Sequence, residues 1–380
     1  MRIYSIRFRD RAYRVLLVEL PKRLVSGETY NMTTSSPTVE VQEKQELHAD
    51  WRKNLSKFEK PSLSKVLVQL TSTLIPYFLL WGLMIYLVKH NVSYWYILPL
   101  LALAAGLNVR IFIFFHDCCH GSYFSSKNAN RILGYITGIM TFTAFEDWRH
   151  NHAGHHATTG DLERRGVGDV WTLTVDEYLA SSTWNKFVYR VFRNPLVLFG
   201  VAPLFVFLIA QRFPHKGYKP RELQSVIVTN LGVLAVGTVM SLAFGLKTYL
   251  LIQIPMMALA SSIGIWLFYV QHQFELVYWE HHKDWDPYKA ALEGSSYYKL
   301  PKILQWFTGN IGLHHLHHLR PKIANYNLQA CYDSIPQLRE AEPLTIRTSM
   351  KSLFLNLWDE SNQKLVGFRA LKTYRRQPSQ

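Results

Sequence analysis

The sequence contains few cysteines and lacks the short motifs that identify several common classes of soluble protein. Its three cysteines, Cys118, Cys119 and Cys331, are an odd number without regular spacing. We therefore exclude a disulfide scaffold and expect the polar segments to face a reducing compartment. No zinc-finger spacing, aromatic RNA-binding motif or isolated basic helix is present, so nucleic acid is the least favoured partner. No GxGxxG motif follows a strand-like segment, which argues against a nicotinamide cofactor bound by this chain.

Acidic residues are also scarce. The chain has 27 Asp and Glu against 42 Lys and Arg among its 380 residues, which gives a formal net charge of +15. Such an excess suits an anionic lipid surface or an acidic protein partner. In a membrane protein it has a simpler meaning as well, because cytoplasmic loops are enriched in Lys and Arg.

Hydrophobic residues make up 48% of the chain and are concentrated in segments that approach the roughly 20 residues needed to cross a bilayer as a helix. Residues 66–88 and 94–115 form one pair of such segments, and residues 226–246 and 249–270 form another. A short linker separates the members of each pair, so we predict two transmembrane helical hairpins. The weaker run 132–145 is too short to span comfortably, and we interpret run 195–213 as interfacial or re-entrant. Six crossings would result if these two runs crossed as a pair.

The distribution of basic residues predicts the orientation. The hairpin linkers carry one Lys each, whereas residues 211–223 and the chain from residue 299 onward are strongly basic. This pattern places the basic segments and both termini on the cytoplasmic side of the cell membrane. Arg110 predicts that the second helix leaves the lipid near that position. We expect residues 1–60 to form a disordered basic tail, with Met32 as an alternative start, and residues 373–380 to form a short C-terminal tail.

Histidines gather at the cytoplasmic ends of the predicted hairpins. All 16 lie there except His48, His90 and His215. Three windows, "HDCCH", "HAGHH" and "HHLHH", contain rings spaced by three or four residues, which places them on one face of a helix. The windows supply His116, His120, His152, His155, His156, His314, His317 and His318. His272, at the end of the last apolar segment, is a further candidate, and converging imidazoles of this kind predict a metal site.

Four other histidines near these windows are not assigned as ligands. His150 lies about 160° from the helical face of His152. His315 lies at the edge of the third face, and we interpret it as a solvated or supporting ring. His281 and His282 lie farther from the last apolar segment and are interpreted as bystanders.

The number of candidate rings predicts the kind of metal centre. Eight or nine imidazoles exceed the four ligands of a closed zinc site, whereas two ions with about four nitrogens each fit, and imidazole is a suitable ligand for iron. The windows contain no Glu-x-x-His pair of the kind that soluble di-iron bundles use. Asp117, Asp161 and Glu275 are candidates to accept hydrogen bonds from the ligand rings. The sequence thus predicts an all-α integral membrane protein, in which two helical hairpins carry a cytoplasmic helical cap with a His-ligated di-iron site.

The three histidine windows and two hairpins resemble those of the membrane fatty-acid desaturase family. Longer segments, including "FHDCCHGSYF", "ATTGDLERRGVGDVWTLTVDEY", "EGSSYYKLPKILQWFTGNIGLHHLHHL" and "KIANYNL", are similar to bacterial cold-responsive acyl-lipid desaturases of the delta-5 type. The resemblance covers residues 61–372, which we assign as a desaturase domain.

This resemblance implies a reaction and its partners. The reaction is the O2-dependent removal of two hydrogens from adjacent methylenes of a saturated acyl chain in a membrane glycerolipid, which gives a cis double bond. Two iron ions are implied as cofactors, bound by the eight histidines of the three windows, and His272 matches an additional family histidine. Because no nicotinamide motif or haem-domain signature is present, a separate electron donor such as an acidic ferredoxin is implied.

Two alternatives stay open. A related di-iron hydroxylase or carotenoid ketolase would share the histidine windows but insert oxygen. A zinc-handling membrane protein would need a polar path across the bilayer, and Arg110 is the sole charged candidate inside the predicted spans.

Overall fold

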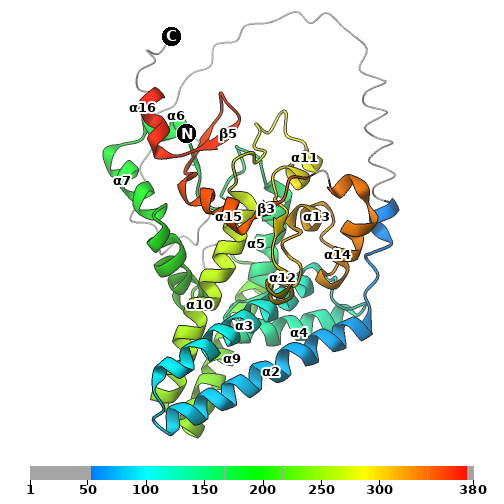
Figure 1. Cartoon of the computed structure of the whole chain (residues 1–380), viewed down its shortest axis with the longest axis vertical. Helices are drawn as coiled ribbons and strands as arrows, with labels where there is room; N and C mark the ends of the chain where they lie inside the picture. The colour runs from blue at the N-terminus through cyan, green and yellow to red at the C-terminus, as the bar shows by residue number, and fades with distance from the viewer. Residues whose placement is uncertain (1–52, 167, 215–216, 340, 375–380) are drawn as a thin grey trace, which may run out of the picture.

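The computed structural model describes residues 53–166, 168–214, 217–339 and 341–374. Most of the tail expected over residues 1–60, including Met32, and residues 375–380 lie outside the described residues. The described chain is mainly helical. Figure 1 shows long helices that converge at one end of the molecule and a cap of shorter elements at the other.

Four long helices form the two hairpins that the sequence predicts. The first hairpin consists of α2 (Leu63–Lys89), the short turn η2 (Tyr94–Tyr96) and α3 (Ile97–His120), and the second of α9 (Pro220–Phe244) and α10 (Leu246–His272). Within the described residues, these four are long and apolar enough to cross a membrane, which confirms the four predicted spans. Helix α3 continues five residues beyond the predicted end at residue 115, so that His116 and His120 lie on its last turns. Both hairpin turns lie at the end of the molecule opposite the cap (Figure 1).

The spanning helices expose apolar side chains that a soluble protein would bury. In α9, only 11% of the most apolar 18-residue window is buried inside the protein. Leu234, Val239 and Leu242 on this helix are 65%, 64% and 83% exposed. Such an all-round apolar surface is stable when lipid surrounds the helix, since the helix satisfies its own backbone hydrogen bonds.

The two weaker apolar runs form shorter or broken helices. The first overlaps α4 (Lys127–Met140), whose start is capped by the Ser126 hydroxyl, which accepts a hydrogen bond from the backbone of Ala129. The second run follows α7 (Thr183–Phe192). It consists of four short helical elements, η3 (Val197–Val201), α8 (Ala202–Leu204), η4 (Phe205–Ile209) and η5 (Ala210–Arg212). The chain bends by 57° between α7 and this segment, which is the geometry of a broken span or a re-entrant segment.

The cap contains short helices and two small sheets. Its longest helix, α5 (Phe145–Thr158), carries the second histidine window. The other cap helices are α6 (Val175–Ala180), α11 (Pro287–Leu292), α12 (Lys302–Phe307), α13 (His314–Leu319), α14 (Asn325–Ser334), η6 (Pro336–Arg339), α15 (Ile346–Ser349), η7 (Met350–Phe354), η8 (Phe368–Ala370) and α16 (Leu371–Tyr374).

The sheets are a feature that the sequence does not predict. One has the order β1 (Leu173–Thr174), β4 (Leu357–Asp359), β5 (Lys364–Val366), with β1 parallel and β5 antiparallel to β4. The other pairs β2 (Tyr298–Lys299) with β3 (Leu344–Thr345) in parallel. Strands of two or three residues are too short to show the alternating pattern by which a strand is found in a sequence.

Residues 55–60, which the sequence assigns to the tail, pack against the cap. Leu55 is 1% exposed and lies in one apolar cluster with Leu316 and Leu328. The side chain of Asn327 donates a hydrogen bond to the carbonyl of Phe58 at 2.9 Å. The packed part of the chain therefore begins before residue 61.

Two buried arginines join the cap to the spanning helices. Arg193 is 3% exposed and donates to the hydroxyl of Tyr269 at 3.1 Å, to Gln273 Oε1 at 3.0 Å and to the carbonyl of Leu355 at 2.5 Å. Arg110 donates to Thr73 Oγ1 at 3.0 Å and to the carbonyl of Trp306, and its guanidinium lies 4.2 Å from the centre of the Trp306 ring. Because these donors are buried and paired, they hold the C-terminal segment and α12 in place.

Candidate metal centre

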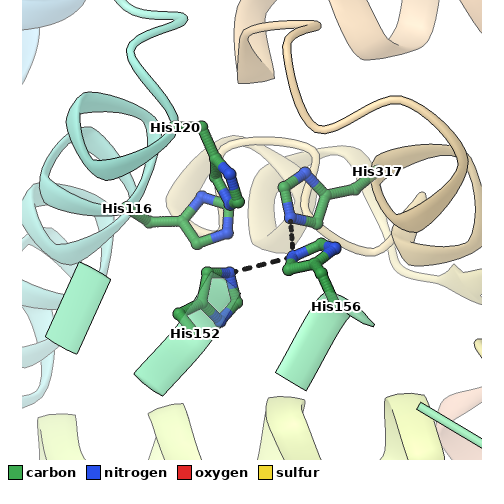
Figure 2. Close-up of side chains that lie close together, drawn as sticks. All are labelled: His116, His120, His152, His156 and His317. Atoms are coloured by element: carbon green, nitrogen blue, oxygen red, sulfur yellow. Dashed lines mark hydrogen bonds between the residues drawn. The ribbon is translucent and has the colours of Figure 1, made fainter. Parts of the chain in front are cut away.

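The nine histidines that the sequence selects lie in two adjacent groups. The five-ring group consists of His116, His120, His152, His156 and His317, and the four-ring group of His155, His272, His314 and His318. In each group the potential ligand nitrogens lie within 4.8 Å of one another. Figure 2 shows the rings of the five-ring group, carried by α3, α5 and α13, pointing toward a common centre. The two groups touch, since the rings of His156 and His318 stack with centroids 4.1 Å apart.

The two HxxHH windows divide between the groups in complementary ways. On α5, His152 and His156 join the five-ring group, whereas His155 joins the four-ring group. On α13, His314 and His318, which are four residues apart, join the four-ring group, and His317 joins the five-ring group. Helical geometry explains the division, because residues four apart differ by about 40° around the axis and a residue three along lies about 60° to the other side. The rings of one window therefore serve two centres rather than the single face that the spacing suggests.

The protons in the four-ring group can be placed from its hydrogen bonds. His155 Nδ1 lies 2.6 Å from Asp169 Oδ1, and His272 Nδ1 lies 3.2 Å from the carbonyl oxygen of Gly294. Both oxygens can only accept, so both Nδ1 atoms donate, and a neutral ring then has a lone pair at Nε2. The two Nε2 atoms face each other at 3.1 Å. Two lone pairs at this distance repel unless a cation lies between them.

The five-ring group also brings unprotonated ring nitrogens close together. The Nε2 atom of His156 lies 3.1 Å from the Nε2 atoms of both His152 and His317. His116 Nδ1 donates to Asp117 Oδ1 at 3.0 Å, which leaves its Nε2 unprotonated. Among the described residues, the buried Nε2 atoms of His116 and His120 have no hydrogen-bond partner. These nitrogens are therefore free to bind a metal.

Burial keeps the rings of the cap neutral. Removal from water, together with repulsion between neighbouring rings, lowers the pKa of five of these histidines well below the usual value. They are His152, His156, His314, His317 and His318. A metal ion thus meets little competition from protons at neutral pH.

The donor set fits two metal ions side by side. The contacts between ring nitrogens within each group range from 2.9 to 3.1 Å, and adjacent ligands of one ion lie about 3 Å apart when metal–nitrogen bonds are about 2.1 Å long. Imidazole nitrogen is a suitable ligand for iron. Within the described part of the chain, neither group includes a carboxylate.

A buried polar network holds the ring of His116 in place. Asp117 Oδ2 accepts hydrogen bonds from the backbone and the side chain of Asn325, at 2.7 and 2.8 Å, while its other oxygen binds His116. Gln69 Nε2 in turn donates to Asn325 Oδ1 at 2.7 Å. The network joins α2, α3 and α14, and it fixes both the tautomer and the orientation of His116.

The other two acidic candidates lie elsewhere. Asp161 Oδ2 binds Arg164 at 2.5 Å and His282 Nδ1 at 2.8 Å, and Glu275 pairs with Lys351 at 3.0 Å on the surface. Neither contacts a ring of the two groups. Besides Asp117, the acid that contacts a ligand ring is Asp169, which the sequence does not single out even though it lies in the quoted segment "ATTGDLERRGVGDVWTLTVDEY".

The histidines that are not assigned as ligands lie outside both groups. His315 is 0% exposed and packs against the rings of Tyr297 and Tyr332; of the two interpretations, a solvated or a supporting ring, the solvated one is therefore wrong. Burial lowers the pKa of His315 to about 4. His281 bridges Glu163 and Glu360 at the surface, at 2.7 and 3.1 Å.

Comparisons with known proteins agree with this arrangement. The family model described as "Fatty acid desaturase" matches residues 93–349. A fatty acid desaturase of Bacillus subtilis is 47% identical over 84% of this chain and 90% of its own length. A ferredoxin-type sn-1 acyl-lipid omega-3 desaturase of Synechocystis is 23% identical over 70% of this chain and 74% of its own length. A chloroplastic omega-6 fatty acid desaturase of Glycine max is 24% identical over 64% of this chain and 57% of its own length.

Proposed function

Because the chain belongs to the fatty acid desaturase family of membrane oxidoreductases, we propose that it forms a cis double bond in a saturated acyl chain of a membrane glycerolipid, with O2 as co-substrate. The nine histidines hold two iron ions, and the electrons come from a separate donor. The subtype remains a prediction from the sequence, whose quoted segments are similar to acyl-lipid desaturases of the delta-5 type.

One observation supports the metal centre most directly. The Nε2 atoms of His155 and His272 face each other at 3.1 Å, while each Nδ1 proton is committed to an oxygen acceptor. Neither nitrogen can donate to the other, so a cation between them accounts for the contact. When bound, iron would supply the O2 activation that breaks an unactivated C–H bond, a step for which side chains alone are too weak.

The protein itself contributes orientation and exclusion of water. Asp117 and Asp169 each accept a hydrogen bond from the Nδ1–H group of a ligand ring, which directs the Nε2 lone pair toward the metal. His155, His314 and His317 are 1%, 3% and 1% exposed. Burial of all four rings of the four-ring group limits reactions of the activated oxygen with solvent on that side of the centre.

The position of the centre suits a lipid substrate. The ligands at the ends of α3 and α10 lie on the last turns of spanning helices, so an acyl chain can reach them without passing through water. An apolar pocket of about 150 Å³ lies between the spanning helices α2, α9 and α10 and the end of α4, and is lined by residues such as Trp81, Met140 and Tyr249. This pocket offers apolar surface for part of an acyl chain.

The orientation and the electron donor are part of the same proposal. The chain has 42 basic and 27 acidic residues, and this excess of positive charge supports a cytoplasmic cap in a cell-membrane protein. The same charge favours an acidic electron donor, because it steers the donor's approach. The name of the Synechocystis relative includes ferredoxin, which supports a donor of that class for this chain.

Product analysis tests the reaction. The full chain is expressed in a host that makes no unsaturated fatty acids, and lipids are analysed by gas chromatography with double-bond location. We expect a new cis double bond in saturated chains and about two irons per purified chain. A hydroxylated chain without a double bond would instead assign an oxygenase, and zinc without either product would assign a metal-handling protein.

A further inference from the structure

A polar pocket of about 740 Å³ lies beside the five-ring group. It is bounded by the end of α3, one face of α5 and the start of α9. Its wall includes the rings of His120 and His152 together with three cations, Arg149, Lys219 and Arg221. A molecule in this pocket is therefore in contact with the candidate metal centre.

The pocket has basic side chains available for an anion. Its two acids are already bonded within the wall: Glu146 binds Arg149 at 2.5 Å, and Glu222 accepts the backbone N–H of Lys219 at 3.0 Å. The side chains of Lys219 and Arg221 are exposed, and within the described ranges neither has an ion-pair partner. Three cations, Arg149, Lys219 and Arg221, against two acids, Glu146 and Glu222, leave one net positive charge in the wall, and the two side chains without an ion-pair partner are of the kind that binds phosphate.

The pocket also lies at the edge of the lipid. Helix α9 begins at Pro220, in the pocket wall, and continues as a candidate membrane span. Among its first apolar residues, Leu223 and Ile227 are 39% and 49% exposed, whereas Val226 is buried. Basic side chains next to the first apolar turn of a spanning helix are placed where the phosphates of membrane lipids lie.

We propose that this pocket binds the phosphate of the glycerophospholipid whose acyl chain is desaturated, an inference that rests on the proposed function. A pocket of this shape admits a headgroup, whereas a folded protein partner would need an open surface. The wall shared with His120 and His152 places the carboxyl end of the acyl chain nearest the metal centre. The position of the double bond is then counted from the headgroup rather than from the methyl end.

The test measures lipid binding separately from turnover. The double variant Lys219→Gln/Arg221→Gln is compared with wild type and with Lys322→Gln/Lys364→Gln, which removes the same charge from two exposed cap lysines away from the pocket. Purified full-length proteins, with and without iron, are titrated with a short-chain phosphatidylglycerol, the matching diacylglycerol and inorganic phosphate. A melting curve for each protein checks folding.

We expect wild type and control to bind phosphatidylglycerol more tightly than diacylglycerol, and the pocket variant to lose affinity for phosphatidylglycerol roughly tenfold or more with diacylglycerol binding unchanged. Equal affinity of all three proteins for phosphatidylglycerol would overturn the proposal. Equal affinity of wild type for phosphatidylglycerol and diacylglycerol would also overturn it, because the phosphate would then have no role. Equal affinity of wild type for inorganic phosphate and phosphatidylglycerol would overturn it as well, because the pocket would then be a site for free phosphate.

Two further outcomes separate this inference from other functions. Slower electron uptake from reduced ferredoxin in the pocket variant, with lipid binding intact, would reassign the pocket to the donor and overturn the proposal. Absence of a double bond in the products of wild type would refute the proposed reaction alone, because the binding measurement with iron-free protein needs no turnover.

Discussion

Replacing Asp117 by Asn tests how the protein orients a metal ligand. The substitution preserves the shape of the side chain and removes its charge. In the native network one carboxylate oxygen accepts the Nδ1 proton of His116 and the other accepts two N–H groups of Asn325. An amide has only one oxygen, so it cannot serve both sides.

Either orientation of the amide is unfavourable. If its oxygen faces Asn325, its NH2 group faces His116 Nδ1, which must then accept, and the ring proton moves to Nε2, where it blocks metal binding. If its NH2 group faces Asn325, two buried N–H groups lose their acceptor, at a cost of about 1–3 kcal/mol each. Loss of such a supporting contact typically weakens metal binding about 10- to 100-fold, which corresponds to about 1.4–2.8 kcal/mol.

The assay is iron retained per chain during dialysis against increasing chelator, with desaturation measured on the same samples. Glu275→Gln is the matched control, because Glu275 is exposed and paired with Lys351 away from both groups. We expect Asp117→Asn to release iron at lower chelator concentration and to lose activity in parallel, while Glu275→Gln follows wild type. Retention curves that superimpose for Asp117→Asn and wild type would refute the role assigned to this carboxylate.

Three further predictions concern other parts of the molecule. His317→Leu should lower bound iron and abolish desaturation, whereas His315→Leu, two residues away in a buried site outside both groups, should retain iron and substantial activity; equal losses would show that the window is divided wrongly. Arg193→Met should lower the melting temperature by several degrees, because it leaves the buried acceptors Gln273 Oε1 and the Leu355 carbonyl without this donor; an unchanged melting curve would contradict this. Iron-free protein should lose thermal stability as the pH falls below about 6.5, because burial lowers the pKa of the cap histidines in the folded state and the unfolded chain takes up protons first; stability that rises toward acid pH would contradict the neutral rings.

Several conclusions follow from the sequence because they depend on local pattern. The four spans are visible as apolar segments of sufficient length, and the structure contains them as α2, α3, α9 and α10. Eight of the nine candidate ligands could be selected because histidines spaced by three or four residues share a side of a helix, and His272 was added because it ends the last apolar segment. The family membership is visible in the same windows.

Other features depend on contacts between distant segments, which spacing along the chain does not encode. Proximity in sequence suggested Asp161 and Glu275 as supporting acids, but folding brings Asp169 to His155 instead. Asn325 reaches Asp117 across 208 positions of sequence, and no local pattern signals such a pair.

The composition and spacing of the sequence by themselves determined a membrane protein with a histidine-rich centre, since helix length and ring periodicity are properties of single segments. Only the tertiary structure decided that each HxxHH window serves both groups of rings. It alone also placed Lys219 and Arg221 in the wall of the same pocket as His120. The physical reason is that the division of a helical face, and the pocket between α3, α5 and α9, arise only when the helices pack against one another.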